Sequence, residues 1–371
     1  MKLAAVIAFV IPFTVAAGPL DTWNLRTSGT TNNLYGVTFA NSSFVAIGAS
    51  GTILTSPNGL SWTSQNPGNT NVGAGITFNG TTWVATGFGG TILTSTNLLS
   101  WVQQNSGTTN LLREAYYANG TFVVVGKIGT LLTSTDATNW ASRSSGTTND
   151  VQGVAYADGT FVVVGKSGVI LTSPTGITWT SRSSGTAGDL TGIIYGNGLF
   201  VASGFESGFS GIILTSPDGI TWTKQSSVAP NELSGVNFGT GVFVAVGSAG
   251  GPNQNIGTSP DGTGWTLRSS GTGPSLYRTV YGAGTFVAVG DSGTILESGD
   301  TGLRLIQPQS LGNSHAFTIT NGVGQHSRIQ ASTNLTTWVD VLTNSSTPAT
   351  SQFQETTAGN FPRRFYRVVV P

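Results

Sequence analysis

A small set of charged residues carries the candidate chemistry of this chain, because only 8% of its 371 residues are charged. Glu114 and Arg278 occupy a position that is glycine in five related segments of the chain. Asp150, Asp189 and Glu232 share another position in three successive segments. Carboxylates and guanidinium groups bind polar ligands through strong hydrogen bonds, and aromatic rings stack on ligands. The other ligand-binding candidates are Arg113, Lys127, Lys166, Asp291, Phe205, Glu206 and Phe209.

Patterns for catalysis or metal binding are weak. The absence of cysteine excludes disulfides, thiol catalysis and cysteine-bound zinc. Both histidines, His315 and His326, lie beyond the repeated part of the chain, so that part has no histidine acid, base or metal cluster. Two carboxylates across a cleft could support glycoside hydrolysis, but the sequence does not give their separation. We therefore predict no catalytic residues, no cofactor and no metal site.

Seven repeats of about 40 residues position these candidates. One tryptophan marks each repeat. A short run such as "FVAVG" follows each of these marker tryptophans and therefore also occurs seven times. Each repeat contains four short β-branched or aromatic runs separated by Gly, Asn, Pro and Ser, which is typical of strands joined by tight turns. The marker tryptophans, spaced by 39 or 43 residues, are Trp23, Trp62, Trp101, Trp140, Trp179, Trp222 and Trp265.

This pattern predicts an all-β fold with a seven-bladed β-propeller over residues 18–302. A four-stranded repeat of about 40 residues is typical of a propeller blade. Trp23 has no strands before it, whereas the last repeat lacks a tryptophan strand. We expect the N-terminal strand, residues 21–27, to close the ring by pairing with residues 294–298. An open β-solenoid is the alternative architecture.

The repeated turn also carries a family resemblance. In "TSPDGITWT" at residues 215–223, the Ser and Asp oxygens can accept hydrogen bonds from the turn, and the tryptophan can fill the space between blades. These residues resemble the Asp-box (BNR) repeat of sialidase-like propellers, although Asp218 and Trp222 are one residue closer than in that pattern. They are also similar to the tryptophan-rich blades of photosystem II assembly-factor propellers.

The sialidase resemblance implies an arginine triad, a tyrosine nucleophile with a glutamate partner, and an acidic residue. Four arginines follow marker tryptophans by three residues and are expected on outer strands. That leaves Arg113 and Arg278, too few for the triad. The repeated tyrosines share a position with Phe39, Phe78 and Phe238, which indicates a core position. The four outer-strand arginines are Arg26, Arg143, Arg182 and Arg268.

Both ends of the chain differ from the repeats. Residues 1–17, "MKLAAVIAFVIPFTVAA", predict a secretory signal peptide and no transmembrane span. Residues 303–371 contain six further strand-like runs and predict a small C-terminal β-sandwich, similar in outline to fibronectin or immunoglobulin-like modules of secreted bacterial proteins. Arg363, Arg364 and Arg367 are candidates for attaching this module to an anionic cell envelope.

The functional expectation follows from the loops. Glu114 and Arg278 are expected near the start of the innermost strand, beside the central channel. Most of the other candidates lie in loops between blades or between second and third strands, and residues 204–211 and 248–255 carry insertions there. Propellers usually bind ligands on this face. Balanced charge, with 15 basic and 15 acidic residues, argues against nucleic acid. We predict a secreted, extracellular, cell-surface or periplasmic protein that binds a polysaccharide or an extracellular protein without catalysis. A carbohydrate-active hydrolase or lyase using these carboxylates is the alternative.

Overall fold

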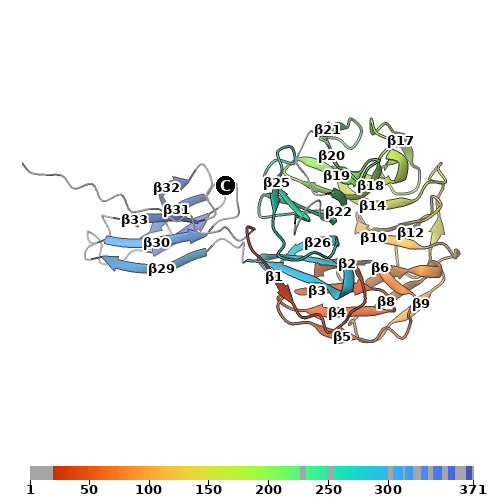
Figure 1. Ribbon diagram of the computed structural model, residues 1–371, viewed down its shortest axis with the longest axis horizontal. Coiled ribbons are helices and arrows are strands. Elements are labelled where there is room, and N and C mark those ends of the chain that lie inside the picture. Colours follow the sequence, from red (N-terminus) through yellow and green to blue (C-terminus); the bar gives the residue numbers. More distant parts are fainter. Residues whose placement is uncertain are drawn as a thin grey trace, which may run out of the picture.

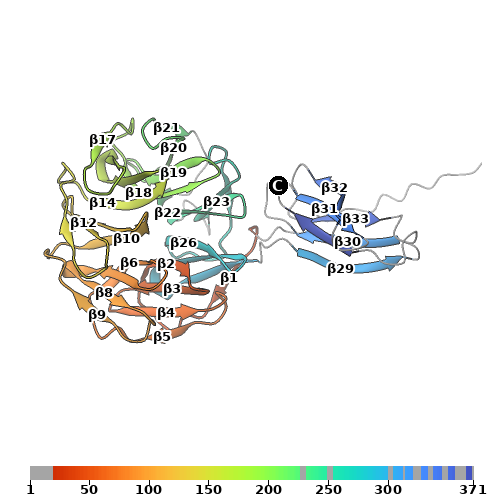
Figure 2. The same cartoon turned by 180° about the vertical axis from the view of Figure 1, so that it is seen from behind.

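Seven four-stranded antiparallel sheets surround a common axis in the computed structural model (Figure 1). The first strand of each sheet lies nearest the centre and the fourth lies at the rim, which is also visible from behind (Figure 2). The fold is therefore the predicted seven-bladed β-propeller. The structure describes residues 20–225, 231–248 and 254–299, and C-terminal segments within 304–369.

The first four blades follow one another along the chain. Blade 1 comprises β2 (Leu34–Ala40), β3 (Ser43–Gly48), β4 (Thr52–Ser56) and β5 (Thr63–Gln65). Blade 2 comprises β6 (Val72–Phe78), β7 (Trp83–Gly87), β8 (Ile92–Ser95) and β9 (Val102–Gln104). Blade 3 comprises β10 (Leu112–Ala118), β11 (Thr121–Gly126), β12 (Leu131–Ser134) and β13 (Ala141–Ser142). Blade 4 comprises β14 (Val151–Ala157), β15 (Thr160–Gly165), β16 (Ile170–Ser173) and β17 (Thr180–Arg182).

The last three blades complete the ring. Blade 5 comprises β18 (Asp189–Gly196), β19 (Leu199–Phe205), β20 (Gly211–Ser216) and β21 (Thr223–Gln225). Blade 6 comprises β22 (Asn231–Gly239), β23 (Val242–Ser248), β24 (Ile256–Ser259) and β25 (Thr266–Arg268). Blade 7 comprises β26 (Leu276–Gly282), β27 (Thr285–Gly290), β28 (Ile295–Ser298) and β1 (Trp23–Arg26). Short 3-10 turns join second and third strands at η1 (Phe88–Gly90), η2 (Lys166–Gly168) and η3 (Asp291–Gly293).

The core lies between neighbouring blades. Each second strand is an apolar run that is buried along most of its length, because a blade covers each of its faces. One aromatic ring of this strand is buried in every blade and packs on the Tyr or Phe of the first strand, as between Tyr117 and Phe122 with ring centres 4.6 Å apart. The repeated tyrosine position is therefore part of the core, as the sequence indicates.

The recurring turn is held by its own side chains. In blade 5, Ser216 Oγ accepts a hydrogen bond from the Gly219 N–H at 2.9 Å. Asp218 Oδ1 accepts from the N–H groups of Thr221 and Ile220, both at 2.8 Å, and these bonds lower the pKa of the Asp218 carboxyl. Trp222 Nε1 donates to the Gly219 carbonyl at 3.0 Å. The repeated residues are therefore a structural device of the outer turn.

Asp218→Ala should lower the free energy of unfolding by about 1 kcal/mol, because the N–H groups of Ile220 and Thr221 lose their protein acceptor and bind water instead. Asp218→Thr is the matched control, because Thr175 occupies this position in blade 4 and its Oγ1 accepts from the Ile177 N–H at 3.3 Å. Urea denaturation should place the threonine variant between alanine and wild type. Equal stability of wild type and the alanine variant would contradict this role of the turn.

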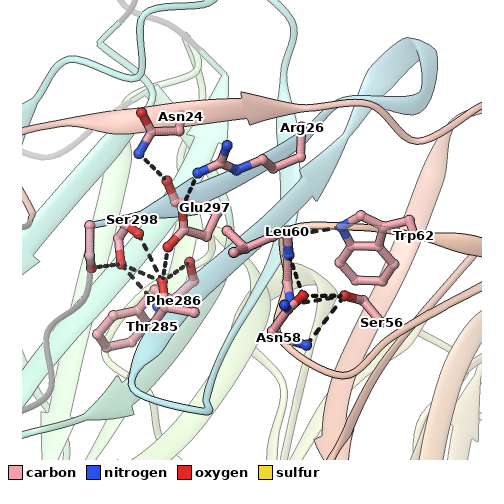
Figure 3. Close-up of polar contacts among 12 residues, drawn as sticks. Asn24, Arg26, Ser56, Asn58, Leu60, Trp62, Thr285, Phe286, Glu297 and Ser298 are labelled. Atoms are coloured by element: carbon pink, nitrogen blue, oxygen red, sulfur yellow. Dashed lines mark hydrogen bonds and ion pairs between the residues drawn. The ribbon is translucent and has the colours of Figure 1, made fainter.

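The N-terminal strand closes the ring. β1 pairs with β28 from Trp23 opposite Ser298 to Arg26 opposite Ile295, which confirms the predicted closure. Arg26 Nη2 lies 2.7 Å from Glu297 Oε2, and the Glu297 side chain is only 7% exposed (Figure 3). Thr285 Oγ1 donates to the other Glu297 oxygen at 2.7 Å. An ion pair with a nearly buried carboxylate thus links the first strand of the chain to the last blade.

Six more strands lie in the C-terminal part, shown in blue in Figure 1. β29 (Arg304–Leu311), β30 (Ser314–Thr320) and β33 (Thr350–Glu355) form one sheet, and β31 (Ser327–Ser332), β32 (Val339–Asn344) and β34 (Phe365–Val369) form another. Packing of the two sheets into a sandwich stays a prediction. The predicted signal peptide and the arginines at 363 and 364 lie outside the described residues. In the described part, no helix is long and apolar enough to cross a membrane.

Candidate functional site

The first strands of all seven blades line a central channel, with a cavity of about 170 Å³. Most of its lining side chains are aliphatic or small, because most first-strand positions here are Val, Ile, Ala, Gly or Thr. Glu114, Tyr116 and Arg278 are the ionisable residues among those that the structure places in this lining. Charge in the channel is therefore confined to residues of blades 3 and 7.

Glu114 and Arg278 meet across the channel. Blades 3 and 7 are not neighbours, yet Arg278 Nη2 lies 3.5 Å from Glu114 Oε2. Arg278 Nη1 also donates to the carbonyls of Ser234 and Tyr277. The shared position is glycine in the other blades, and a Cβ on Gly75 would lie 2.6 Å from the Glu114 Cα. Glycine thus lets the inner strands approach, and two blades instead send a long side chain into the channel.

Burial raises the pKa of the Glu114 carboxyl to about 7, although the charge and hydrogen bond of Arg278 oppose this shift. Protein surrounds the carboxyl deep in the channel, while 24% of the side-chain surface remains accessible. Removing a carboxylate from water disfavours its charged form, and a partner at 3.5 Å compensates only in part. Glu114 is therefore poised to gain or lose a proton near neutral pH.

This raised pKa makes stability depend on pH in a defined direction. The folded protein binds the Glu114 proton more tightly than the unfolded chain does, so the stabilisation is complete below about pH 4.5 and is lost as pH rises through about 7. Its full size is roughly 3 kcal/mol. Glu114→Gln should therefore gain up to roughly 3 kcal/mol over wild type at pH 8.5 and much less at pH 5, measured by urea denaturation. An equal difference at both pH values would contradict the assignment.

A pocket of about 380 Å³ lies at the mouth of the channel. First strands supply most of its wall, loops between second and third strands supply Phe88 and Lys127, and the connection before β10 supplies Leu111. The rings of Tyr35 and Tyr277 lie 5.4 Å apart in this wall. Arg278 lines both the pocket and the channel below it. The described lining residues are Tyr35, Ala74, Phe88, Leu111, Arg113, Lys127, Gln152, Tyr277 and Arg278.

The pocket has an excess of positive charge. Arg113 Nη2 lies 3.9 Å from Asp150 Oδ2, and its buried Nε has no hydrogen-bond partner among the described residues. Burial lowers the pKa of the Arg113 guanidinium, the Asp150 charge opposes this shift, and the Arg278 charge adds to it. Lys127 adds a third cation to the lining. An anionic group entering the pocket would therefore meet partly compensated cations.

Two members of the predicted acidic set hold neighbouring blades together. Asp150 Oδ1 accepts from the Ile128 N–H of blade 3 at 3.1 Å, and Asp189 Oδ1 accepts from the Ser167 N–H of blade 4 at 3.0 Å. Asn33 does the same for Ser292 of blade 7 at 2.9 Å. The sequence hypothesis listed Asp150 and Asp189 as candidate ligand contacts. The structure gives both a role in fixing the loops of the preceding blade.

The remaining candidates lie outside the pocket lining. Glu206 accepts from Lys224 at 2.7 Å and from Thr186 at 2.8 Å, and these bonds lower its pKa. Phe209 is 61% exposed. The other contacts of the set are Glu232 with Ser248 at 3.2 Å, Asp291 with the Tyr277 hydroxyl at 2.6 Å, Lys166 with Asp189 at 3.9 Å, and Phe205 paired in β19 with Asp189.

Among the polar side chains of the pocket lining, sequence reasoning missed three, Tyr35, Gln152 and Tyr277. Each directly precedes the Gly, Glu or Arg position of its first strand. Across the blades this preceding position is Tyr, Ala, Arg, Gln, Thr, Ser and Tyr, a variation that scaffold positions do not show. That variation is the signal that could have identified the pocket. In the described part of the chain, no group of three or more His, Cys, Asp or Glu residues could hold a metal ion.

No protein-family model and no curated protein matches the chain. Virginiamycin B lyase from Staphylococcus aureus matches with a TM-score of 0.66 and 13% identity over 75% of this chain and 99% of that chain. YCF48 from Cyanidioschyzon merolae matches with 0.59 and 16% over 75% and 98%. YCF48 bound to D1 peptide matches with 0.58 and 16% over 74% and 96%.

At these identities the similarity establishes the fold. It supports the predicted resemblance to photosystem II assembly-factor propellers at that level, because YCF48 is such a factor. The Asp-box resemblance and the fibronectin-like or immunoglobulin-like module stay predictions. The neighbours include both an enzyme and a peptide-bound propeller. This chain is therefore a seven-bladed propeller with a charged pocket at its channel mouth.

Proposed function

We propose that this chain is a non-catalytic binding propeller that holds a segment of another protein in the pocket at its channel mouth. The observation that carries the proposal is the combination of three cationic and three aromatic side chains around one pocket of about 380 Å³. Aromatic rings bury apolar side chains, while arginine forms charge-assisted hydrogen bonds. The neighbouring YCF48 structure has a bound peptide, which supports a peptide ligand on this fold.

Hydrolase or lyase chemistry has less support. Glycoside hydrolysis commonly uses two carboxyl groups on either side of the bond that breaks. Glu114 is the one carboxyl residue in the described lining of the pocket and channel. Asp150, Asp189 and Glu206 already accept hydrogen bonds from the protein itself. The described lining of the pocket and channel therefore has no carboxyl pair of the kind that the alternative, a carbohydrate-active enzyme, would use.

We further propose an extracellular, cell-surface or periplasmic location, on the basis of the signal-like residues 1–17. Such a protein would meet either exported proteins or polysaccharides. The pocket favours a peptide, because cations and aromatic rings line the same site. The C-terminal strands would then serve as a separate module, which attaches the propeller to a cell envelope.

A synthetic peptide library and a polysaccharide array, presented to the purified protein, test this function. We expect peptides to bind and the selected peptides to lose at least tenfold in affinity with Arg113→Gln, because a pocket cation is lost. Arg143→Gln is the matched control, since Arg143 Nε donates to Thr133 Oγ1 at 2.8 Å on the outer strand. Binding to the polysaccharides alone, or peptide binding unaffected by Arg113→Gln, would overturn the proposal.

A further inference from the structure

Arg278 is shared between two environments. One nitrogen of its guanidinium, Nη1, is held in place, because it donates to the Ser234 and Tyr277 carbonyls. The other nitrogen, Nη2, faces Glu114 at 3.5 Å, which is longer than the 2.7–2.9 Å typical of a charge-assisted bond. The same residue lines the mouth pocket. Arg278 therefore has a fixed position and a loosely held acidic partner.

We propose, resting on the binding function above, that a carboxylate of the bound peptide replaces Glu114 as the partner of Arg278, and that Glu114 takes up one proton in the exchange. Before binding, the pair consists of one guanidinium and one carboxylate. Afterwards the ligand supplies the carboxylate, and the proton taken from solvent neutralises Glu114. The net charge of the site stays constant, so the exchange avoids burying an uncompensated second anion.

The surroundings of Glu114 favour this proton uptake. The channel lining adds polar but non-ionisable side chains from β2, β6, β22 and β26, namely Thr38, Thr77, Asn237 and Thr279. Tyr116 on β10 is the other ionisable lining group, and its pKa is raised, chiefly by burial. The cations that face the region are Arg278, Arg113 and Lys127. Once a ligand carboxylate binds Nη2 of Arg278, no other cation in the described channel lining replaces the lost contact with the Glu114 carboxylate.

The carboxylate can come from two sources with the same chemistry, the free end of a peptide or an Asp or Glu side chain. Three probes separate them: N-acetyl-phenylalanine, its amide, and N-acetyl-aspartyl-phenylalanine amide. Each has an aromatic ring that can pack among the pocket aromatics. We expect at least one carboxylate probe to bind at least tenfold more tightly than the uncharged amide.

Proton uptake is measured by calorimetric titration in buffers with different ionisation enthalpies. At pH 7.5 we expect roughly three quarters of a proton to be taken up per ligand, because Glu114 is mostly ionised at that pH. Affinity should fall as pH rises from 6 to 8.5. Glu114→Gln should bind with no linked uptake and with affinity independent of pH in this range, while Tyr116→Phe should behave as wild type.

Two results would overturn the exchange: a carboxylate probe that binds without proton uptake, or equal affinities for the carboxylate and amide probes. Absence of carboxylate binding in nuclear magnetic resonance titrations would overturn it as well. In each case the proposed function stands if library peptides still bind and respond to Arg113→Gln. Failure of the whole library overturns the proposed function instead, so the two failures are distinguishable.

Discussion

Arg26→Ala is expected to lower the free energy of unfolding by about 3 kcal/mol, because it leaves the Glu297 carboxylate nearly buried without its cation. Arg26 stands on the strand that closes the ring, so the loss falls on the one blade built from both ends of the propeller. Loosening of β1 would also expose the edge of β28, and exposed strand edges promote aggregation. Urea denaturation and light scattering measure the two effects.

Glu297→Thr provides the control. Other blades have threonine at this third-strand position, and in blade 3 Arg143 Nε donates to Thr133 Oγ1 at 2.8 Å. Arg26 can make the same neutral-acceptor contact, so we expect Glu297→Thr to change stability by less than about 1 kcal/mol. A free energy of unfolding for Arg26→Ala equal to that of wild type would contradict this role of the ion pair. A loss with Glu297→Thr as large as that with Arg26→Ala would contradict it as well.

Arg278→Gln is expected to weaken binding of the selected peptides by about 30-fold, since it removes a pocket cation that also lines the channel. Folding near neutral pH should survive, because Glu114 without its partner can take up a proton. Affinity is measured by titration calorimetry and folding by thermal melting.

Lys224→Gln is the matched control for this substitution. Lys224 pairs with Glu206 at 2.7 Å on the outer strand, away from the pocket lining. We expect its peptide affinity to equal that of wild type. Unchanged affinity with Arg278→Gln, or equal losses in both variants, would show that the ligand binds elsewhere.

Much of the architecture could be predicted from sequence because each blade repeats the same short-range signals. The apolar second strand, the polar turn with Asp, Asn or Thr, and the marker tryptophan recur in order, and the isolated Trp23 indicates ring closure. Departures from the repeat also located Glu114 and Arg278 in the channel. A repeat fixes which residues are equivalent, so any exception to it stands out.

The contacts between exceptions could not be predicted. The sequence places Arg278 and Glu114 at equivalent positions of blades 7 and 3, but it does not determine whether the Arg278 side chain reaches Glu114 across the channel. The hydrogen bond that Asp150 accepts comes from the backbone N–H of Ile128 in the preceding blade, and Ile128 lies in the left-handed region at φ 54°. Tyr277 was missed because a tyrosine on an inner strand is expected to pack in the core. Such features depend on side-chain direction, which spacing alone does not determine.

Photo-crosslinking tests the central claim most directly, namely that a protein segment binds at the channel mouth. Tyr35→p-benzoylphenylalanine places the reactive group in the pocket wall. Ile177→p-benzoylphenylalanine places it on an exposed outer turn of the opposite face, where the side chain is 52% exposed. The account predicts that selected peptides crosslink at position 35 and not at position 177. Crosslinking at position 177 alone would contradict it.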